Sequence, residues 1–155
     1  MHIHHLEISA HEDQKLYGSI STLNILISEI EAKSIPEEVC FKINYQIDKV
    51  NFSYRENDGL IKKQLDIAFR KILNILKRDL GIIPENYYRN LWLALGMSVF
   101  GLPLGALIAT LTSNTSYLVF GMLMGIVIGI AYGSKKDKDA LQENKVIILE
   151  RDKNE

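Results

Sequence analysis

Apolar residues form two nearly continuous runs in the second half of this chain, at residues 91–111 and 117–133. Five polar residues separate the runs, and neither run contains Asp, Glu, Lys, Arg or His. Helices of these lengths reach roughly 31 and 26 Å, against a hydrocarbon core of about 30 Å. A signal peptide would lie at the chain start, and a buried soluble hairpin would need a larger surrounding domain. The pattern therefore predicts a transmembrane hairpin with spans at about 88–111 and 117–134.

The preceding residues follow a different pattern, in which apolar positions recur at intervals of three and four. Such stripes are typical of amphipathic helices, and they extend over about 12–33, 36–53 and 61–80. Their members are Leu16, Ile20, Leu23, Ile27 and Ile30, then Val39, Cys40, Ile43, Ile47 and Val50, then Ile61, Leu65, Ala68, Ile72, Leu76 and Leu80. A turn at 57–59 and the glycine Gly81 mark boundaries. Three helices with short connections predict an antiparallel bundle.

The fold class predicted is an all-α membrane protein with three parts. A cytoplasmic three-helix amphipathic domain (1–83) precedes a two-helix transmembrane hairpin (84–134), and a cytoplasmic tail (135–155) follows. In the tail, residues 145–150 predict a short β-strand, for which residues 3–8, either of the same chain or of a neighbouring copy, are the expected partner strand.

Four apolar residues lie outside the narrow stripes of the three helices. They are Ile25, Leu26, Tyr45 and Ile67. Either they are covered within the bundle, or they form a surface through which copies of the chain associate. The sequence leaves both alternatives open.

Small residues recur at intervals of about four along both predicted spans. The second span carries Gly121, Gly125, Gly129 and Gly133, and the first carries Gly96, Ser98, Gly101, Gly105 and Ala109. A ridge of small residues allows two helix backbones to approach closely. The contact joins either the two spans of one hairpin or the hairpins of several copies. Pro103 lacks a backbone donor, which predicts a kinked or loosened helix in the middle of the first span. Either this point acts as a hinge, or the helix tolerates the proline without moving.

Charge is divided unevenly along the predicted helical domain. Residues 1–58 carry five basic and ten acidic side chains, whereas residues 59–89 carry seven basic and three acidic. Six of the basic residues are Lys62, Lys63, Arg70, Lys71, Lys77 and Arg78. Their position beside the hairpin favours contact with anionic lipid headgroups. The alternative is a site for a phosphorylated regulator, a nucleotide or an oligonucleotide, although the chain has no Gly-rich phosphate loop.

Basic residues flank the hairpin on both open ends, at 77–89 before it and at 135–138 after it, and the connecting loop has none. By the positive-inside rule, both termini should lie in the cytoplasm. Tyr87, Tyr88 and Trp92 predict an aromatic belt at the membrane interface.

Candidate catalytic and metal-binding residues are few. His2 and His4 would project to the same side of a strand and are candidate metal ligands, but no further ligand completes a recognisable spacing. The spans contain no ionisable residue, which argues against a proton relay or an active transporter. No nucleophile has an assignable base, and the single cysteine, Cys40, belongs to an apolar stripe. The prediction is a protein that is not an enzyme and needs no cofactor.

Part of the chain resembles a known group of membrane proteins. The likeness rests on residues 88–97, the Gly-Leu-Pro-Leu-Gly element at 101–105, the glycines of the second span and the lysines at 135–136, and it covers residues 88–139. These features resemble small bacterial glycine-zipper proteins with two membrane spans. In layout the chain is also similar to two-span membrane effectors of anti-phage defence, such as that of the Hailong system. The resemblance implies an oligomeric channel in a bacterial inner membrane, kept closed until a nucleotide signal is gained or lost.

Two functions are therefore expected. The first is a homo-oligomeric inner-membrane channel or pore, such as a tetramer, which the cytoplasmic domain gates and which disrupts the membrane potential in anti-phage defence. The second is a passive membrane anchor or adaptor whose helical domain recruits a soluble partner. The expected partners are membrane lipid, further copies of the chain, and a soluble operon partner or a nucleic-acid-like ligand.

Overall fold

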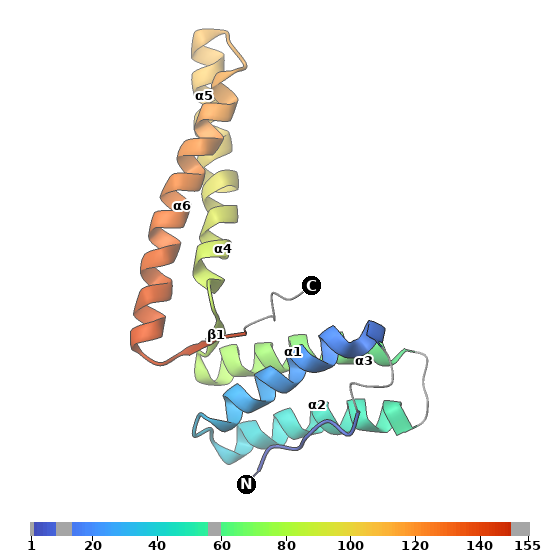
Figure 1. The fold of residues 1–155 in the computed structure, drawn as a ribbon. Coiled ribbons are helices and arrows are strands. Elements are labelled where there is room, and N and C mark those ends of the chain that lie inside the picture. The colour runs from blue at the N-terminus through green and yellow to red at the C-terminus, as the bar shows by residue number, and fades with distance from the viewer. Residues whose placement is uncertain (1, 9–13, 56–59, 150–155) are drawn as a thin grey trace. The chain divides into compact units, whose positions relative to one another are not determined.

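The computed structural model describes residues 2–8, 14–55 and 60–149 (Figure 1). Contacts along the chain divide it into two compact units, Met1–Pro84 with Ile147–Glu155, and Glu85–Val146. The turn predicted at 57–59 lies outside the described residues.

Three helices form the first unit at the predicted places: α1 (Gln14–Glu31), α2 (Glu37–Arg55) and α3 (Ile61–Ile75). The backbone of α3 continues as a π-helical stretch, η1 (Leu76–Leu80). Gly81 ends this helix with a φ of 68°, a left-handed conformation that favours glycine. The three predicted helices are thereby confirmed.

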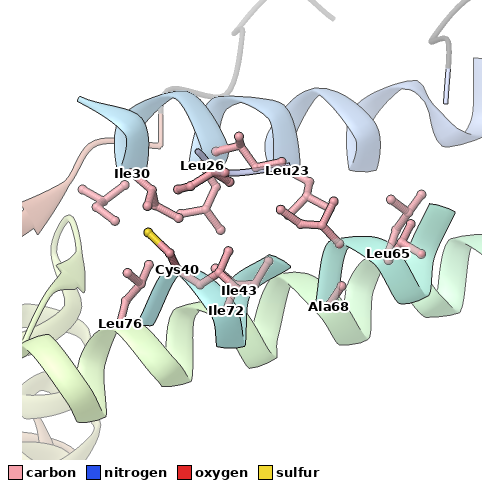
Figure 2. Packing of buried hydrophobic residues seen from close by; sticks show 14 of the residues in the cluster. Leu23, Leu26, Ile30, Cys40, Ile43, Leu65, Ala68, Ile72 and Leu76 are labelled. Carbon is pink, nitrogen blue, oxygen red and sulfur yellow. The ribbon is translucent and has the colours of Figure 1, made fainter. Parts of the chain in front are cut away.

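The apolar stripes of these helices meet in one core (Figure 2). Its fully buried members include Ile20, Leu23, Leu26, Ile30, Ile43, Ile47, Val50, Leu65, Ile72 and Leu76. Cys40 is buried among them as a small apolar side chain. Leu26 lies outside the narrow stripe predicted for α1, but it is fully buried in this core. The buried face of α1 is therefore broader than a single stripe. Tyr45 is exposed, whereas Ile25 and Ile67 are half-buried.

Residues 2–8 are held by α2 and do not form a strand. The side chains of Asn44 and Asn51 each accept a hydrogen bond from one backbone N–H of this segment and donate one to a backbone carbonyl, at 2.9–3.1 Å. Ile3 and Ile8 are buried in the core. The two asparagines therefore satisfy backbone groups that an extended segment would otherwise offer to a neighbouring strand.

The strand predicted in the tail is shorter than expected and has a different partner. It is β2 (Val146–Ile147), and the two-stranded sheet pairs it with β1 (Ile83–Pro84). The predicted pairing with residues 3–8 of the same chain is wrong, because Asn44 and Asn51 bind that segment instead.

The second unit contains two helices that are long and apolar enough to cross a membrane. The first is made of α4 (Tyr87–Leu95), a π-helical stretch η2 (Gly96–Gly101) and α5 (Leu102–Thr112), and the second is α6 (Tyr117–Gln142). Figure 1 shows the two helices side by side, joined at one end by a short loop. The second helix continues well beyond 134, the end predicted for its span, because its charged last turns remain helical.

Candidate functional site

The two long helices pack through their glycines. Seven are buried in the second unit: Gly96, Gly101, Gly105, Gly121, Gly125, Gly129 and Gly133. A Cβ atom at Gly105 would lie 2.7 Å from the backbone oxygen of Leu118, and one at Gly133 would lie 2.6 Å from that of Tyr88. Optimal contacts between carbon atoms lie near 3.5–4.0 Å, so neither position has room for a methyl group. The two backbones touch, and glycine is the residue that allows it.

This contact uses the glycine face inside one chain. The sequence allows the ridges to join two spans or several copies, and the structure places all seven glycines between the spans of one hairpin. Packing of membrane helices depends on such van der Waals contact. The hairpin is therefore a closely packed unit, and a contact between copies needs another face.

A second row of small residues lies on the outer side of the first span. Ala94, Ser98, Ala106 and Thr110 are exposed and are separated by multiples of four residues. The Ser98 hydroxyl donates a hydrogen bond to the carbonyl of Ala94, and the Thr110 hydroxyl donates one to that of Ala106, both at 2.8 Å. Each hydroxyl oxygen keeps the capacity to accept a further hydrogen bond. The structure thus separates Ser98 from the glycine ridge, while Ala109 is half-buried at its edge.

The first span departs from α-helical geometry at its centre. The stretch η2 is π-helical, and Pro103 follows two residues after it, exposed on the outside of the hairpin. Proline has no N–H to donate to the carbonyl four residues earlier, that of Val99, and its ring crowds that carbonyl. A π-helical stretch is a common local response to such a disruption. The backbone remains helical at Leu102, with φ −63° and ψ −50°, so the hydrogen-bond pattern changes without a break.

A carboxylate closes the open end of the hairpin. Asp137 of α6 accepts hydrogen bonds from the backbone N–H groups of Tyr88 and Arg89, at 2.9 and 2.8 Å. These groups belong to the first turn of α4, where helical donors lack partners, and Asn86 provides no side-chain cap. Asp137 therefore caps the first span from the opposite helix, and its charge suits the positive end of the helix dipole. The sequence alone does not indicate this role of Asp137, because no local pattern links positions so far apart.

Aromatic residues reinforce the same end of the hairpin. The rings of Trp92 and Tyr132 meet edge to face, with centroids 4.3 Å apart. The ammonium group of Lys136 lies 5.6 Å from the ring centroid of Tyr88 and 5.9 Å from that of Tyr132. Such contacts contribute about 0.5–1 kcal/mol at exposed sites. The predicted aromatic belt thus includes a cross-helix contact between spans.

Four of the six predicted basic residues gather on one face of α3. A shallow depression of about 570 Å³ is lined by Leu60, Lys62, Lys63, Asp66, Ile67, Arg70 and Lys71. Among the described residues, none of its four cations forms an ion pair. Arg78 binds Asp79 at 2.9 Å, and Lys77 lies exposed outside the depression. The depression is open to solvent, and its four cations against the single carboxylate of Asp66 give it a net positive charge.

Asp79 joins the end of the third helix to α2. Its carboxylate oxygens lie 2.9 Å from Nε of Arg78 and 2.9 Å from Nζ of Lys42. Hydrogen bonds from these two cations, that of Arg78 first, lower the pKa of Asp79. Lys42 also binds Glu38 at 2.7 Å, and both carboxylates raise the pKa of Lys42. These groups stay charged at neutral pH and hold η1 against α2.

The histidines considered as metal ligands have other surroundings. Nδ1 of His4 lies 2.7 Å from Oδ1 of Asp48, and His2 is exposed. Within residues 2–8, 14–55 and 60–149, no three side chains of His, Cys, Asp or Glu converge. The structure therefore brings no third ligand to His2 and His4.

Comparisons with protein families, curated proteins and solved structures found no match to this chain. The fold defines the class: a mostly helical protein with two apolar helices able to cross a membrane and a separate three-helix unit. The function is argued below from the geometry of these parts.

Proposed function

We propose that this protein is a homo-oligomeric membrane pore whose opening is controlled by its three-helix unit. The observation that carries the proposal is the outer row of Ala94, Ser98, Ala106 and Thr110 on the first span. For a hairpin that only anchored the chain, large apolar side chains over its whole outer surface would be sufficient, and a row of small ones would have no role. Small side chains and hydroxyl groups there are better suited to a helix contact or to a pore lining.

The glycine contact supports the assembly of hairpins as complete units. Because the glycines are occupied within the chain, neighbouring copies meet through outer faces, and the row containing Ser98 and Thr110 faces the axis. Both hydroxyl groups already donate to carbonyls of their own helix, so their oxygens are the groups left to meet water or a cation. With Leu102 between them, a narrow pore of this composition closes by excluding water.

The π-helical stretch is the proposed moving part. Short π-helical segments occur frequently at functional sites, and Pro103 leaves the adjacent hydrogen-bond pattern incomplete. A shift of η2 toward regular α-helix would rotate Ser98, which lies within η2, and the preceding helix α4 relative to the part of the span after Pro103. The open and closed pores would differ by this rotation.

The location and the trigger belong to the same proposal. The charge pattern favours both termini in the cytoplasm, and the resemblance to small bacterial membrane proteins implies the inner membrane. The basic face of α3 is the candidate receptor for a nucleotide or oligonucleotide, and the resemblance to defence effectors implies loss of membrane potential during infection.

Ion flux from liposomes tests the pore. Purified protein should release a trapped cation, and Ala106→Leu should reduce the flux strongly by filling the lining. The matched control is Ala131→Leu on α6, which adds the same side chain to another exposed position. Flux is measured alone and with added mononucleotides or short oligonucleotides. If no condition produces flux, or if both variants conduct equally, the pore proposal fails.

A membrane anchor is the second candidate, and the exposed aromatic residues Phe41, Tyr45 and Phe52 on α2 favour it. A surface of this kind would dock a soluble partner. Absence of flux together with a stable, stoichiometric complex on purification from native membranes would support the anchor over the pore.

A further inference from the structure

The outer face of α2 carries large side chains that the first unit leaves uncovered. Phe41, Tyr45 and Phe52 are 65%, 62% and 60% exposed. Aromatic side chains normally contribute 150–250 Å² each to a core or an interface, so three on one helix are unusual for a surface in water. Exposed aromatic surface of this kind is typical of a face that another molecule covers.

Spacing shows that these residues belong to one continuous stripe. The outer face of α2 consists of Glu38, Phe41, Tyr45, Asp48, Phe52 and Arg55. The intervals between its members are three, four, three, four and three, which is the spacing of helix pairs that pack along one seam. This stripe lies on the side of α2 opposite the buried residues Ile43 and Val50.

The stripe is complementary to itself when it is reversed. A second copy running antiparallel, with the two-fold axis between positions 46 and 47, sets Phe41 against Phe52 of the second copy. The same register sets Tyr45 against Asp48 and Glu38 against Arg55. Aromatic residues thus meet each other, a phenol meets a carboxylate, and an acid meets a base. A parallel pair would instead place Glu38 on Glu38 and Arg55 on Arg55, which is repulsive.

Existing contacts on this face leave room for such a partner. Asp48 binds His4, Arg55 binds Glu7 and Glu38 binds Lys42, but the three side chains remain 55%, 67% and 81% exposed. Carboxylate and guanidinium groups take several hydrogen bonds at once. Residues 2–8 attach through Asn44 and Asn51 at the side of the stripe and leave its aromatic rings open.

We propose that the outer face of α2 is the contact between two copies of this chain, paired antiparallel about a two-fold axis. The inference rests on the proposed assembly of copies and names the contact that the helical unit contributes. The three aromatic residues would bury roughly 350 Å² per copy, below the ~800 Å² per partner of a stable interface. Pairing therefore depends on the hairpins, which confine the copies to one membrane and raise their effective concentration.

Disulfide cross-linking tests the register. Cys40 is the single cysteine, so the background is Cys40→Ala. Phe41→Cys is placed on one tagged copy and Phe52→Cys on another, and full-length protein in membranes is oxidised with copper phenanthroline. One Phe41–Phe52 contact per pair stays intact in this design. The expected product is the mixed dimer.

Single-variant samples provide the discriminating control. In the antiparallel pair, two copies of position 41 lie eleven residues apart along the axis, roughly 16 Å, too far for a disulfide. Phe41→Cys alone should therefore give no dimer. Tyr17→Cys, at another exposed aromatic residue, should give none with Phe41→Cys. Dimers of Phe41→Cys with itself, or no dimer in any sample, would overturn the inference.

Charge reversal separates an interface from a folding defect. Glu38→Arg should reduce the mixed dimer several-fold, and Arg55→Glu added to the same chain should restore it, with Glu7→Arg included so that positions 7 and 55 keep their ion pair. Failure of the combined variant to recover counts against the pairing. Cross-linking is measured independently of ion flux. Flux without a mixed dimer would therefore refute this contact but not the pore, and a mixed dimer without flux would refute the pore but not this contact.

Discussion

Replacing Gly125 by alanine tests the glycine packing of the hairpin at its centre. A Cβ atom there would lie 2.8 Å from Cα and 2.9 Å from N of Gly101, and closer still to the carbonyl oxygen of Gly96. All of these atoms are backbone, so no side chain can turn away. The helices have to separate by about 1 Å to restore ordinary contact distances.

The cost of that separation follows from the geometry. Overpacking costs about 1–3 kcal/mol, and the backbone clash at Gly125 places this change near the upper end. Alanine is a better helix former by about 1 kcal/mol, but separated spans remain helical in a micelle, so that gain cancels. We expect Gly125→Ala to weaken the packed hairpin by about 2–3 kcal/mol, or 30- to 150-fold in the equilibrium constant.

The single tryptophan supplies the assay. Trp92 packs on Tyr132 of the opposite helix, so its fluorescence should report separation of the spans during titration of mixed micelles with a denaturing detergent. Gly125→Ala should move the midpoint to a lower detergent fraction, whereas Ala131→Gly, at an exposed position of the same helix, should not. A midpoint for Gly125→Ala equal to or above that of the wild type would refute the packing argument.

Three further predictions concern other contacts. Asp137→Ala removes the cap from α4 and should destabilise the packed hairpin by about 1–2 kcal/mol, which lowers the same detergent midpoint. Asp139→Ala is the exposed control, and an equal effect of the two variants would contradict the capping role. Asp79→Asn should lower the thermal midpoint of the helical unit at neutral pH. Because its pKa lies below the usual 3.8, the advantage of Asp79 over asparagine should vanish as pH falls below that value, and a constant difference by circular dichroism would contradict this. Gly18→Ala, where a Cβ meets nothing within 4 Å, should stabilise α1 by about 1 kcal/mol, and a lower thermal midpoint would contradict it.

Local patterns were sufficient to predict the helices. Intervals of three and four predicted α1, α2 and α3, and two charge-free runs predicted the long helices, because periodicity and length depend only on neighbouring residues. The same logic failed for residues 3–8, which have the composition of a strand. Asn44 and Asn51, about forty residues away, provide the backbone partners there.

The candidate sites divide in the same way. The six basic residues near the hairpin were evident as a group in the sequence, but only folding showed that Lys62, Lys63, Arg70 and Lys71 share a depression while Arg78 binds Asp79. The exposed face of α2 followed the same three-four spacing as a core stripe. The spacing alone does not tell which of the two stripes of α2 is buried. The fold decides it, because the core covers the side of Ile43 and Val50 and leaves the other side exposed.

The sequence by itself determined the class of this protein: amphipathic helices followed by a hairpin of membrane length. It also identified the glycines, since a small residue at every fourth position is a property of the helix repeat. Only the tertiary structure decided that these glycines face one another within a chain, that Ser98 and Thr110 point outward, and that Asp137 caps α4. The reason is physical: which face of a helix is covered depends on partners that are distant in sequence, and local periodicity carries no information about them.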